Sequence, residues 1–183
     1  MTPASTIAAT HLGFLTVLHD AGGSVGGYLV TNLWGRPLEF RMSTAVQPNR
    51  IQQILYSHTL SAYVCGEVIG KTLLDRSATA AQVVLTDTYD ALSLRRCFDV
   101  PVVWAASATD PRAARLAEQG ALVRPTAGAR GPLLAHPDFP DDRPRLRELF
   151  ERLSGLDLAE PFARIRDAMA EARKLGVTQR AAG

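Results

Sequence analysis

The sequence predicts a mixed α/β fold: a three-stranded antiparallel meander that continues into a mixed sheet with flanking helices, plus a C-terminal helical pair. Three observations predict it. β-rich segments separated by turn sequences open the chain, short and wholly apolar runs follow, and amphipathic helical patterns close it. Strands joined by short turns, and then strands alternating with helices, are typical of a single α/β domain.

The meander occupies residues 12–46. An apolar segment, 12–18, runs into a turn composition at Gly22 and Gly23, and a second strand is expected over 24–32. Gly35 and Pro37 then favour another reversal. The third strand alternates with a period of two, which predicts a half-buried strand with its apolar side chains toward the core. The apolar side is Leu38, Phe40, Met42, Thr44 and Val46, and the polar side is Glu39, Arg41 and Ser43.

A long helical segment, 47–75, comes next, with Ile51, Ile54 and Leu55 on one face. Its apolar phase slips at 57–59, which predicts a kink or two abutting helices there. Residues 82–86 and 100–105 are continuous apolar runs of the kind found in strands covered on both faces.

A helix over 111–119 is expected to start at Asp110 as its N-cap, and 121–125 is a candidate last strand. Two amphipathic helices follow a Gly- and Pro-rich stretch. The expected organisation is a flexible arm over 1–11, a mixed α/β domain over 12–125, a loop over 126–142, and C-terminal helices over 143–176 that pack on the same domain.

The resulting order, β-β-β-α-β-α-β-α-(β)-α-α, resembles that of an RNase H-like fold. Right-handed crossovers make this arrangement accessible. Several other three-layer α/β folds share the same order of elements, so the resemblance rests on the order of the elements and not on a sequence motif.

The charge and the hydrophobic pattern of the chain limit the classes of partner that we expect. The 183 residues carry a net charge of +2, and 18 of the 20 basic residues are arginine. Acids nearly match bases, so we interpret the arginine excess as the codon bias of a GC-rich bacterial genome and expect nucleic acid less than a protein partner or a homo-oligomer. No apolar run is long enough to cross a membrane and no leader pattern is present, which predicts a cytoplasmic protein without a membrane partner.

Four acids are candidates for catalysis: Asp87, Asp90, Glu67 and Asp20. RNase H-like nucleases hold Mg²⁺ or Mn²⁺ between carboxylates around a phosphodiester. Asp87 is expected at the end of the fourth strand, as such a site requires, but residues 14–18 of the first strand contain no acid. The favoured alternative is that Asp87 and Asp90 cap a short helix expected over 91–98 and complement its dipole.

The corner at Trp34 is the preferred binding surface. Trp and Arg are enriched in interface hot spots, and the candidate binding residues are Trp34, Arg36, Glu39, Arg41 and Arg50. In the competing interpretation, the side chain of Trp34 packs over the end of the core.

No complete catalytic motif is present, and the sequence therefore favours a non-catalytic interaction or adaptor subunit of a bacterial cytosolic system. One alternative is a divalent-metal-dependent RNase H-like nuclease. The other is a small-ligand-binding regulator with a pocket at the carboxyl ends of the buried strands, where Thr86, Thr88, Ser107 and Thr109 offer hydroxyls.

Overall fold

The computed structural model describes residues 10–124, 131–153 and 155–176. The strands form one seven-stranded sheet in the order β3-β2-β1-β4-β5-β7-β6. Their bounds are β1 His11–Asp20, β2 Gly23–Asn32, β3 Pro37–Met42, β4 Val83–Thr86, β5 Val102–Ala105, β6 Leu122–Arg124 and β7 Leu133–Ala135.

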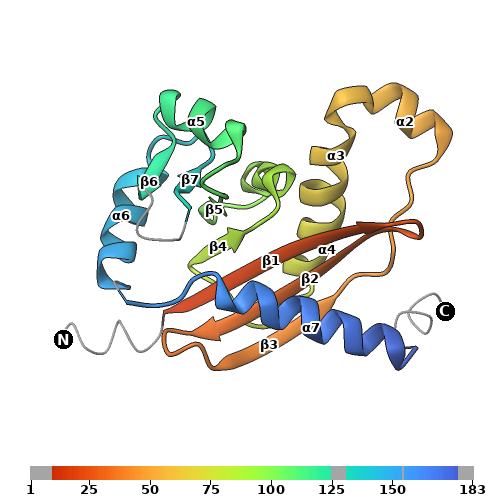
Figure 1. Ribbon diagram of the computed structural model, residues 1–183, viewed down its shortest axis with the longest axis horizontal. Helices are drawn as coiled ribbons and strands as arrows, with labels where there is room; N and C mark the ends of the chain where they lie inside the picture. Colours follow the sequence, from red (N-terminus) through yellow and green to blue (C-terminus); the bar gives the residue numbers. More distant parts are fainter. Residues whose placement is uncertain (1–9, 125–130, 154, 177–183) are drawn as a thin grey trace.

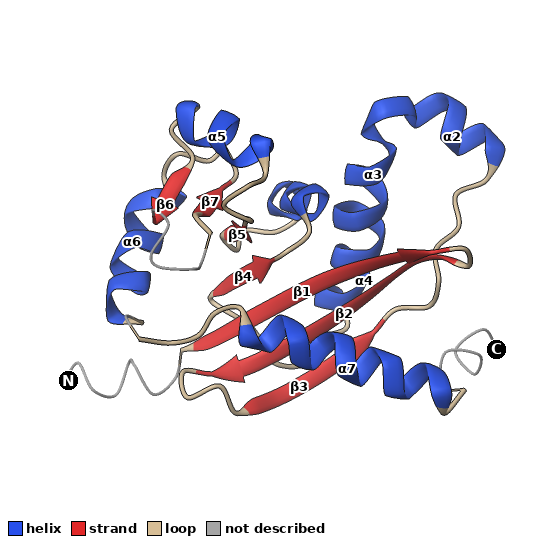
Figure 2. Cartoon of the chain, viewed as in Figure 1, coloured by secondary structure: helices blue, strands red, loops and turns tan. Residues whose placement is uncertain are grey.

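The pairing of the first five strands is that of an RNase H-like sheet (Figure 2). The meander β1-β2-β3 is antiparallel, while β4 lies parallel to β1 and β5 parallel to β4. The predicted mixed α/β fold class and topology are confirmed. At the far edge, β7 pairs antiparallel with both β5 and β6.

Helices cover the sheet on both faces (Figure 1). One core lies between the sheet and the helical segments of residues 60–75, 89–96 and 111–118, and a second lies under α6 and α7. The helical segments are α2 Arg50–Tyr56, the 3-10 helix η1 Ser57–Thr59, α3 Leu60–Ala62, the π-helix η2 Tyr63–Gly70, α4 Lys71–Asp75, the 3-10 helix η3 Tyr89–Arg96, α5 Pro111–Glu118, α6 Asp142–Arg152 and α7 Glu160–Lys174. Among the described residues, no helix is long and apolar enough to cross a membrane.

The predicted break in the long helical segment is confirmed. Ser57 has a φ of 46°, an unusual backbone conformation for a residue other than glycine. The break separates α2 from α3, and α2 extends away from the body of the molecule (Figure 1). The side chains of Ile51, Ile54 and Leu55 are therefore exposed and contribute nothing to either core.

Two glycines inside β2 set how closely the helices approach the sheet. A Cβ atom on Gly26 would lie 2.2 Å from Cγ2 of Ile69 in η2, and one on Gly27 would lie 2.5 Å from Cγ2 of Ile165 in α7. Neighbouring strand residues face opposite sides of a sheet. The glycine-rich stretch thus serves packing on both faces, and the turn itself is only Ala21–Gly22.

The structure differs from the sequence-based expectations at both ends of the sheet. Leu38 and Phe40 are 44% and 39% exposed, because β3 is an edge strand and α7 packs over β1 and β2 instead. β7 lies inside the segment expected as a loop, 126–142. Of the expected N-terminal arm, residues 1–9 lie outside the described residues and His11 already belongs to β1.

Candidate functional site

A cavity of about 290 Å³ lies at the carboxyl ends of β1 and β4. Open α/β sheets commonly bind ligands at this edge. Of the hydroxyl residues that the sequence pointed to, Thr88 lines the cavity. Among the described residues, the lining is Thr16, Val17, Leu18, His19, Asp87, Thr88, Tyr89, Asp90, Arg112 and Arg166.

Asp87 is one of the two carboxylates that line this cavity. The hydroxyls of Thr16 and Thr88 donate hydrogen bonds of 3.1 and 3.3 Å to its Oδ1 atom. Its Oδ2 atom forms an ion pair with the guanidinium of Arg166 in α7. The carboxylate thus joins β1, the end of β4 and α7, and both of its oxygens are engaged.

The environment of Asp87 acts on its acidity in two directions. Burial raises the pKa of the Asp87 carboxyl, while Arg166 and the hydroxyls of Thr16 and Thr88 lower it. Burial is the larger effect, so the pKa of this group lies above its ordinary value. Perturbed acids in a cleft are candidates for functional groups.

A second guanidinium, that of Arg112, is held firmly at the same cavity. It donates hydrogen bonds from Nε and Nη2 to the two carboxylate oxygens of Asp110, at 3.0 and 2.7 Å. It also stacks 4.6 Å from the ring centre of Tyr89. Asp110 caps α5 through the backbone N–H of Arg112, as the sequence predicts. Fixed guanidinium groups are suited to phosphate because little side-chain freedom is lost on binding.

The four candidate acids do not converge. Asp90 lines the cavity, where its Oδ2 atom accepts a 2.7 Å hydrogen bond from Ser61. Glu67 is exposed on η2, and Asp20 forms a 2.7 Å ion pair with Arg173. Neither lines the cavity.

Neither Asp87 nor Asp90 makes a capping hydrogen bond to the following helix η3, although Asp90 lies in its first turn, where a negative charge complements the helix dipole. The N-cap of η3 is Thr88, without a side-chain capping bond, and the backbone N–H of Ala91 donates to the carbonyl of Thr88. The two acids bond instead to residues of β1, α7 and α3, as described above.

The cavity does not fit the Mg²⁺ or Mn²⁺ centre that an RNase H-like nuclease implies. Magnesium prefers octahedral oxygen ligands, and two-metal sites need several carboxylates. Here Thr16 stands in β1 opposite Asp87, and Arg166 already neutralises Asp87. The described part of the chain contains no group of three or more His, Cys, Asp or Glu that could hold a metal ion.

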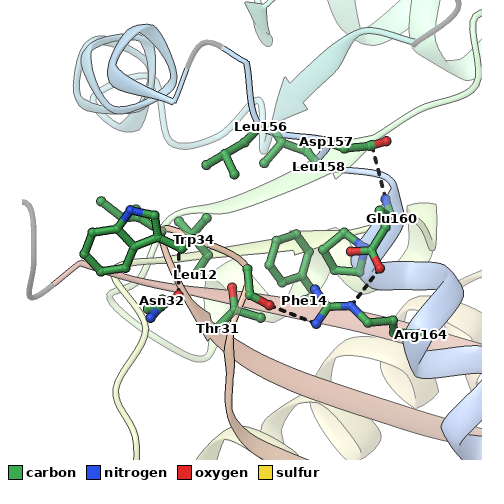
Figure 3. A pocket seen from close by; sticks show the side chains of 13 residues that line it. Leu12, Phe14, Thr31, Asn32, Trp34, Leu156, Asp157, Leu158, Glu160 and Arg164 are labelled. Atoms are coloured by element: carbon green, nitrogen blue, oxygen red, sulfur yellow. Dashed lines mark hydrogen bonds and ion pairs between the residues drawn. The ribbon is translucent and has the colours of Figure 1, made fainter.

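A second, smaller pocket of about 150 Å³ lies near Trp34, between the start of β1, the end of β2 and the start of α7. Figure 3 shows Trp34 at one side of it and Arg164 at the other. Arg164 donates a 2.8 Å hydrogen bond to the carbonyl of Gly35 and forms a 2.9 Å ion pair with Glu160. Trp34 itself is 74% exposed, so it does not fold over the core.

The remaining binding candidates are divided among three places. Arg36 is exposed in the same turn as Trp34. Glu39 and Arg41 form an ion pair, and Glu39 also accepts hydrogen bonds from the backbone N–H groups of Ala78 and Thr79, which ties β3 to the segment after α4. Arg50 begins α2 at the opposite end of the molecule (Figure 1). The structure does not bring all five candidates together.

Sequence reasoning missed Thr16, Arg112 and Arg166 as parts of this site. Arg166 lies 79 residues from Asp87 in the chain, on the polar face of a helix where solvated arginines are ordinary. Nothing in its neighbourhood distinguishes it. Arg112 carried a weak signal, because it follows the N-cap residue Asp110 and comes soon after a buried strand.

No protein-family model matches this chain, and no curated protein sequence matches it. Among solved structures it is similar to endonuclease V of Ciona intestinalis in complex with DNA containing an inosine, with 10% identity, a TM-score of 0.41, and coverage of 69% of this chain and 70% of that one. It is also similar to Argonaute of Marinitoga piezophila in complex with a guide RNA, with 12% identity, a TM-score of 0.31, and coverage of 56% and 17%.

These findings overturn the interpretation as a non-catalytic interaction or adaptor subunit, since the similar structures are an endonuclease on DNA and an Argonaute on guide RNA. The RNase H-like assignment itself stands on the strand order and pairing of this chain. The DNA and the guide RNA are ligands of those two proteins.

Proposed function

We propose that this protein binds nucleic acid and takes a phosphodiester group into the cavity around Asp87. The observation that carries the proposal is the meeting of two guanidinium groups, those of Arg112 and Arg166, in one cavity at the carboxyl ends of β1 and β4. Guanidinium groups recognise phosphate oxygens through paired N–H donors. The similar structures support nucleic acid as the class of ligand.

The charges of the cavity are compatible with an incoming phosphate. Arg112 and Arg166 are each about half exposed, at 49% and 47% of the side chain, although both have carboxylate partners. Each guanidinium carries five N–H donors, so a carboxylate partner leaves further donors for a phosphate. The hydroxyls of Thr16 and Thr88 already orient Asp87 from the strand side.

Cleavage of the bound phosphodiester is a second candidate function, favoured by the presence of Asp87 and Asp90 in the same cavity. A carboxyl group with a raised pKa is suited to accept the proton of a water whose oxygen bonds to phosphorus, while the P–O bond to the leaving oxygen breaks and that oxygen takes up a proton from solvent. Fixed guanidinium groups stabilise the charge that develops on the phosphate. This candidate makes Asp87 the catalytic residue and the arginines its electrostatic partners.

The surface around Trp34 and Arg36 is proposed as an additional contact. An exposed indole offers a face on which a base can stack, a contact that contributes about 1–3 kcal/mol per base in single-strand-binding proteins. Arg36 lies two residues away and supplies a charge for the backbone.

A binding assay tests the main proposal. Fluorescence anisotropy of a labelled single-stranded oligonucleotide should show binding that weakens with salt. Arg112→Gln should weaken it about tenfold and lower the salt slope by about one. Arg152→Gln is the matched control, because Arg152 is a half-exposed, carboxylate-paired arginine that does not line the cavity. Equal affinities of the two variants would refute the proposal.

Cleavage is measured separately on gels, with Asp87→Asn as the variant. Asn keeps the shape of the side chain and one acceptor oxygen for the hydroxyls of Thr16 and Thr88, but it has no negative charge and cannot accept the proton. Loss of cleavage with binding retained supports the second candidate. Absence of cleavage by the wild type, or cleavage unaffected by Asp87→Asn, removes it.

A further inference from the structure

We propose that the guanidinium of Arg166 takes the place of a divalent cation beside Asp87, so that the cavity receives a phosphate directly and without a metal ion. The identity of the ligand rests on the proposed function. The exclusion of the cation rests on contacts within this chain alone.

The oxygens of Asp87 are already occupied. Two hydroxyls, of Thr16 and Thr88, donate to Oδ1, and Arg166 is ion-paired with Oδ2. A divalent cation at Oδ2 would lie in contact with a guanidinium of the same sign, and the two would repel each other. Metal binding would therefore require Arg166 to leave.

The other metal-ligand types among the described residues that line the cavity are engaged elsewhere, and Nδ1 of His19 lies 2.8 Å from the hydroxyl oxygen of Ser24. Thr16 offers a neutral hydroxyl from β1, and its neighbours Val17 and Leu18 are apolar. The carboxylate of Asp90 is held by Ser61. Hard divalent cations bind oxygen sites chiefly through carboxylates, and one neutralised carboxylate is a poor site.

Arg166 is placed by the fold and not only by its ion pair. Its neighbours in α7, Ile165 and Met169, are completely buried under the sheet, so the helix is fixed where the guanidinium enters the cavity. The guanidinium remains near Asp87 when a phosphate arrives, and its remaining N–H groups can bind two phosphate oxygens. A fixed organic cation thus does the charge neutralisation that a metal ion does elsewhere.

The experiment uses the full chain and two probes. The first is Mn²⁺ alone, titrated and followed by electron paramagnetic resonance of the free ion. The wild type should show no saturable binding, whereas Arg166→Glu, which places a second carboxylate beside Asp87, should bind Mn²⁺ saturably and at least about tenfold more tightly than the upper limit that the titration sets for the wild type. The gain should disappear in the double variant Arg166→Glu with Asp87→Asn.

The second probe is the labelled oligonucleotide, measured in EDTA and in Mg²⁺. The wild type should bind in EDTA at least as tightly as in Mg²⁺, which competes for the phosphates as a counterion, and Arg166→Gln should bind about tenfold more weakly than the wild type in both. Circular dichroism and the melting temperature establish that each variant is folded. Because the side chain of Arg166 is half exposed, its replacement is compatible with folding.

The outcomes separate the inference from the proposed function. Saturable Mn²⁺ binding by the wild type that Asp87→Asn abolishes overturns the inference, even where the oligonucleotide still binds. A folded Arg166→Glu protein without a gain in Mn²⁺ binding, or oligonucleotide binding that requires Mg²⁺, also overturns it. Failure of the wild type to bind the oligonucleotide, with the Mn²⁺ results as expected, removes the proposed function and leaves the cation replacement standing.

Discussion

The hydroxyl of Thr16 in β1 donates a 3.1 Å hydrogen bond to Oδ1 of Asp87, although 71 residues separate the two in the chain. Thr16 is 1% exposed and directly follows Leu15, which pairs with Thr86 at the end of β4. The group that faces Asp87 from the first strand is therefore a hydroxyl and not a carboxylate. Asp87 is bound by this hydroxyl and by the guanidinium of Arg166, with which it forms an ion pair.

Replacing Thr16 tests that relationship through the acidity of Asp87. Thr16→Val removes a hydrogen bond to the charged carboxylate, so the pKa of Asp87 should rise further above its ordinary value. Thr16→Ser keeps the donor and should leave that pKa unchanged. The measurement is the ¹³C shift of the Asp87 carboxyl against pH, assigned with Asp87→Asn. Identical titrations in the Val and Ser variants would contradict the structure.

Glu39 should make stability depend on pH at the acid end. Burial alone would raise its pKa, but hydrogen bonds from Ala78, Arg41, Thr79 and Ser77 lower the pKa of Glu39 from 4.5 to about 2. Its stabilising contribution is therefore complete above about pH 4.5 and is lost as the pH falls toward 2, because the unfolded chain takes up the proton first.

We expect a loss of about 2 kcal/mol in the free energy of unfolding over that pH range, after allowance for solvent screening. Urea unfolding at a series of pH values measures it, and Glu39→Gln should flatten the profile. Glu148→Gln is the control, since Glu148 is an exposed ion-pair partner of Arg152. Equal slopes in the wild type and Glu39→Gln would show that the Glu39 contacts contribute nothing.

Because η2 lies close to β2, we expect a substitution in η2 to offset part of the stability lost through a substitution in β2. Gly26→Ala places a methyl group against Ile69 and should lower the free energy of unfolding by about 1–3 kcal/mol. Ile69→Ala opens a cavity and should cost about 2–5 kcal/mol. In the double variant the new methyl partly fills that cavity, so the combined loss should be smaller than the sum of the two. If the losses in free energy of unfolding of the two single variants simply added, positions 26 and 69 would not be in contact.

The two tryptophans should respond differently to acrylamide. Trp34 is 74% exposed and Trp104 is 2% exposed. Quenching of the wild type should show one accessible and one protected component, and Trp34→Phe should retain only the protected one. If the Trp34 surface contacts nucleic acid as proposed, saturating oligonucleotide should shield the accessible component. Unchanged quenching in the complex would remove Trp34 from the binding surface.

Local patterns predicted much of this fold. The turn signals, the apolar runs of β4 and β5, the slipped phase at Ser57 and the Asp110 cap all concern interactions within a few residues, which the order of side chains encodes directly. The order of elements then restricted the topology to few choices. These features required no knowledge of which segments meet.

The site depended on contacts that no local pattern contains. Alternation in β3 identified a strand with two faces, yet only the path of α7 decided that Leu38 and Phe40 are left uncovered. Likewise, periodicity placed Arg166 on the polar face of a helix, and packing of that helix across β1 brought it to Asp87. The sequence by itself determined the elements and their order. The tertiary structure decided their partners, because burial and ion pairing are set by which surfaces the folded chain brings within a few ångströms.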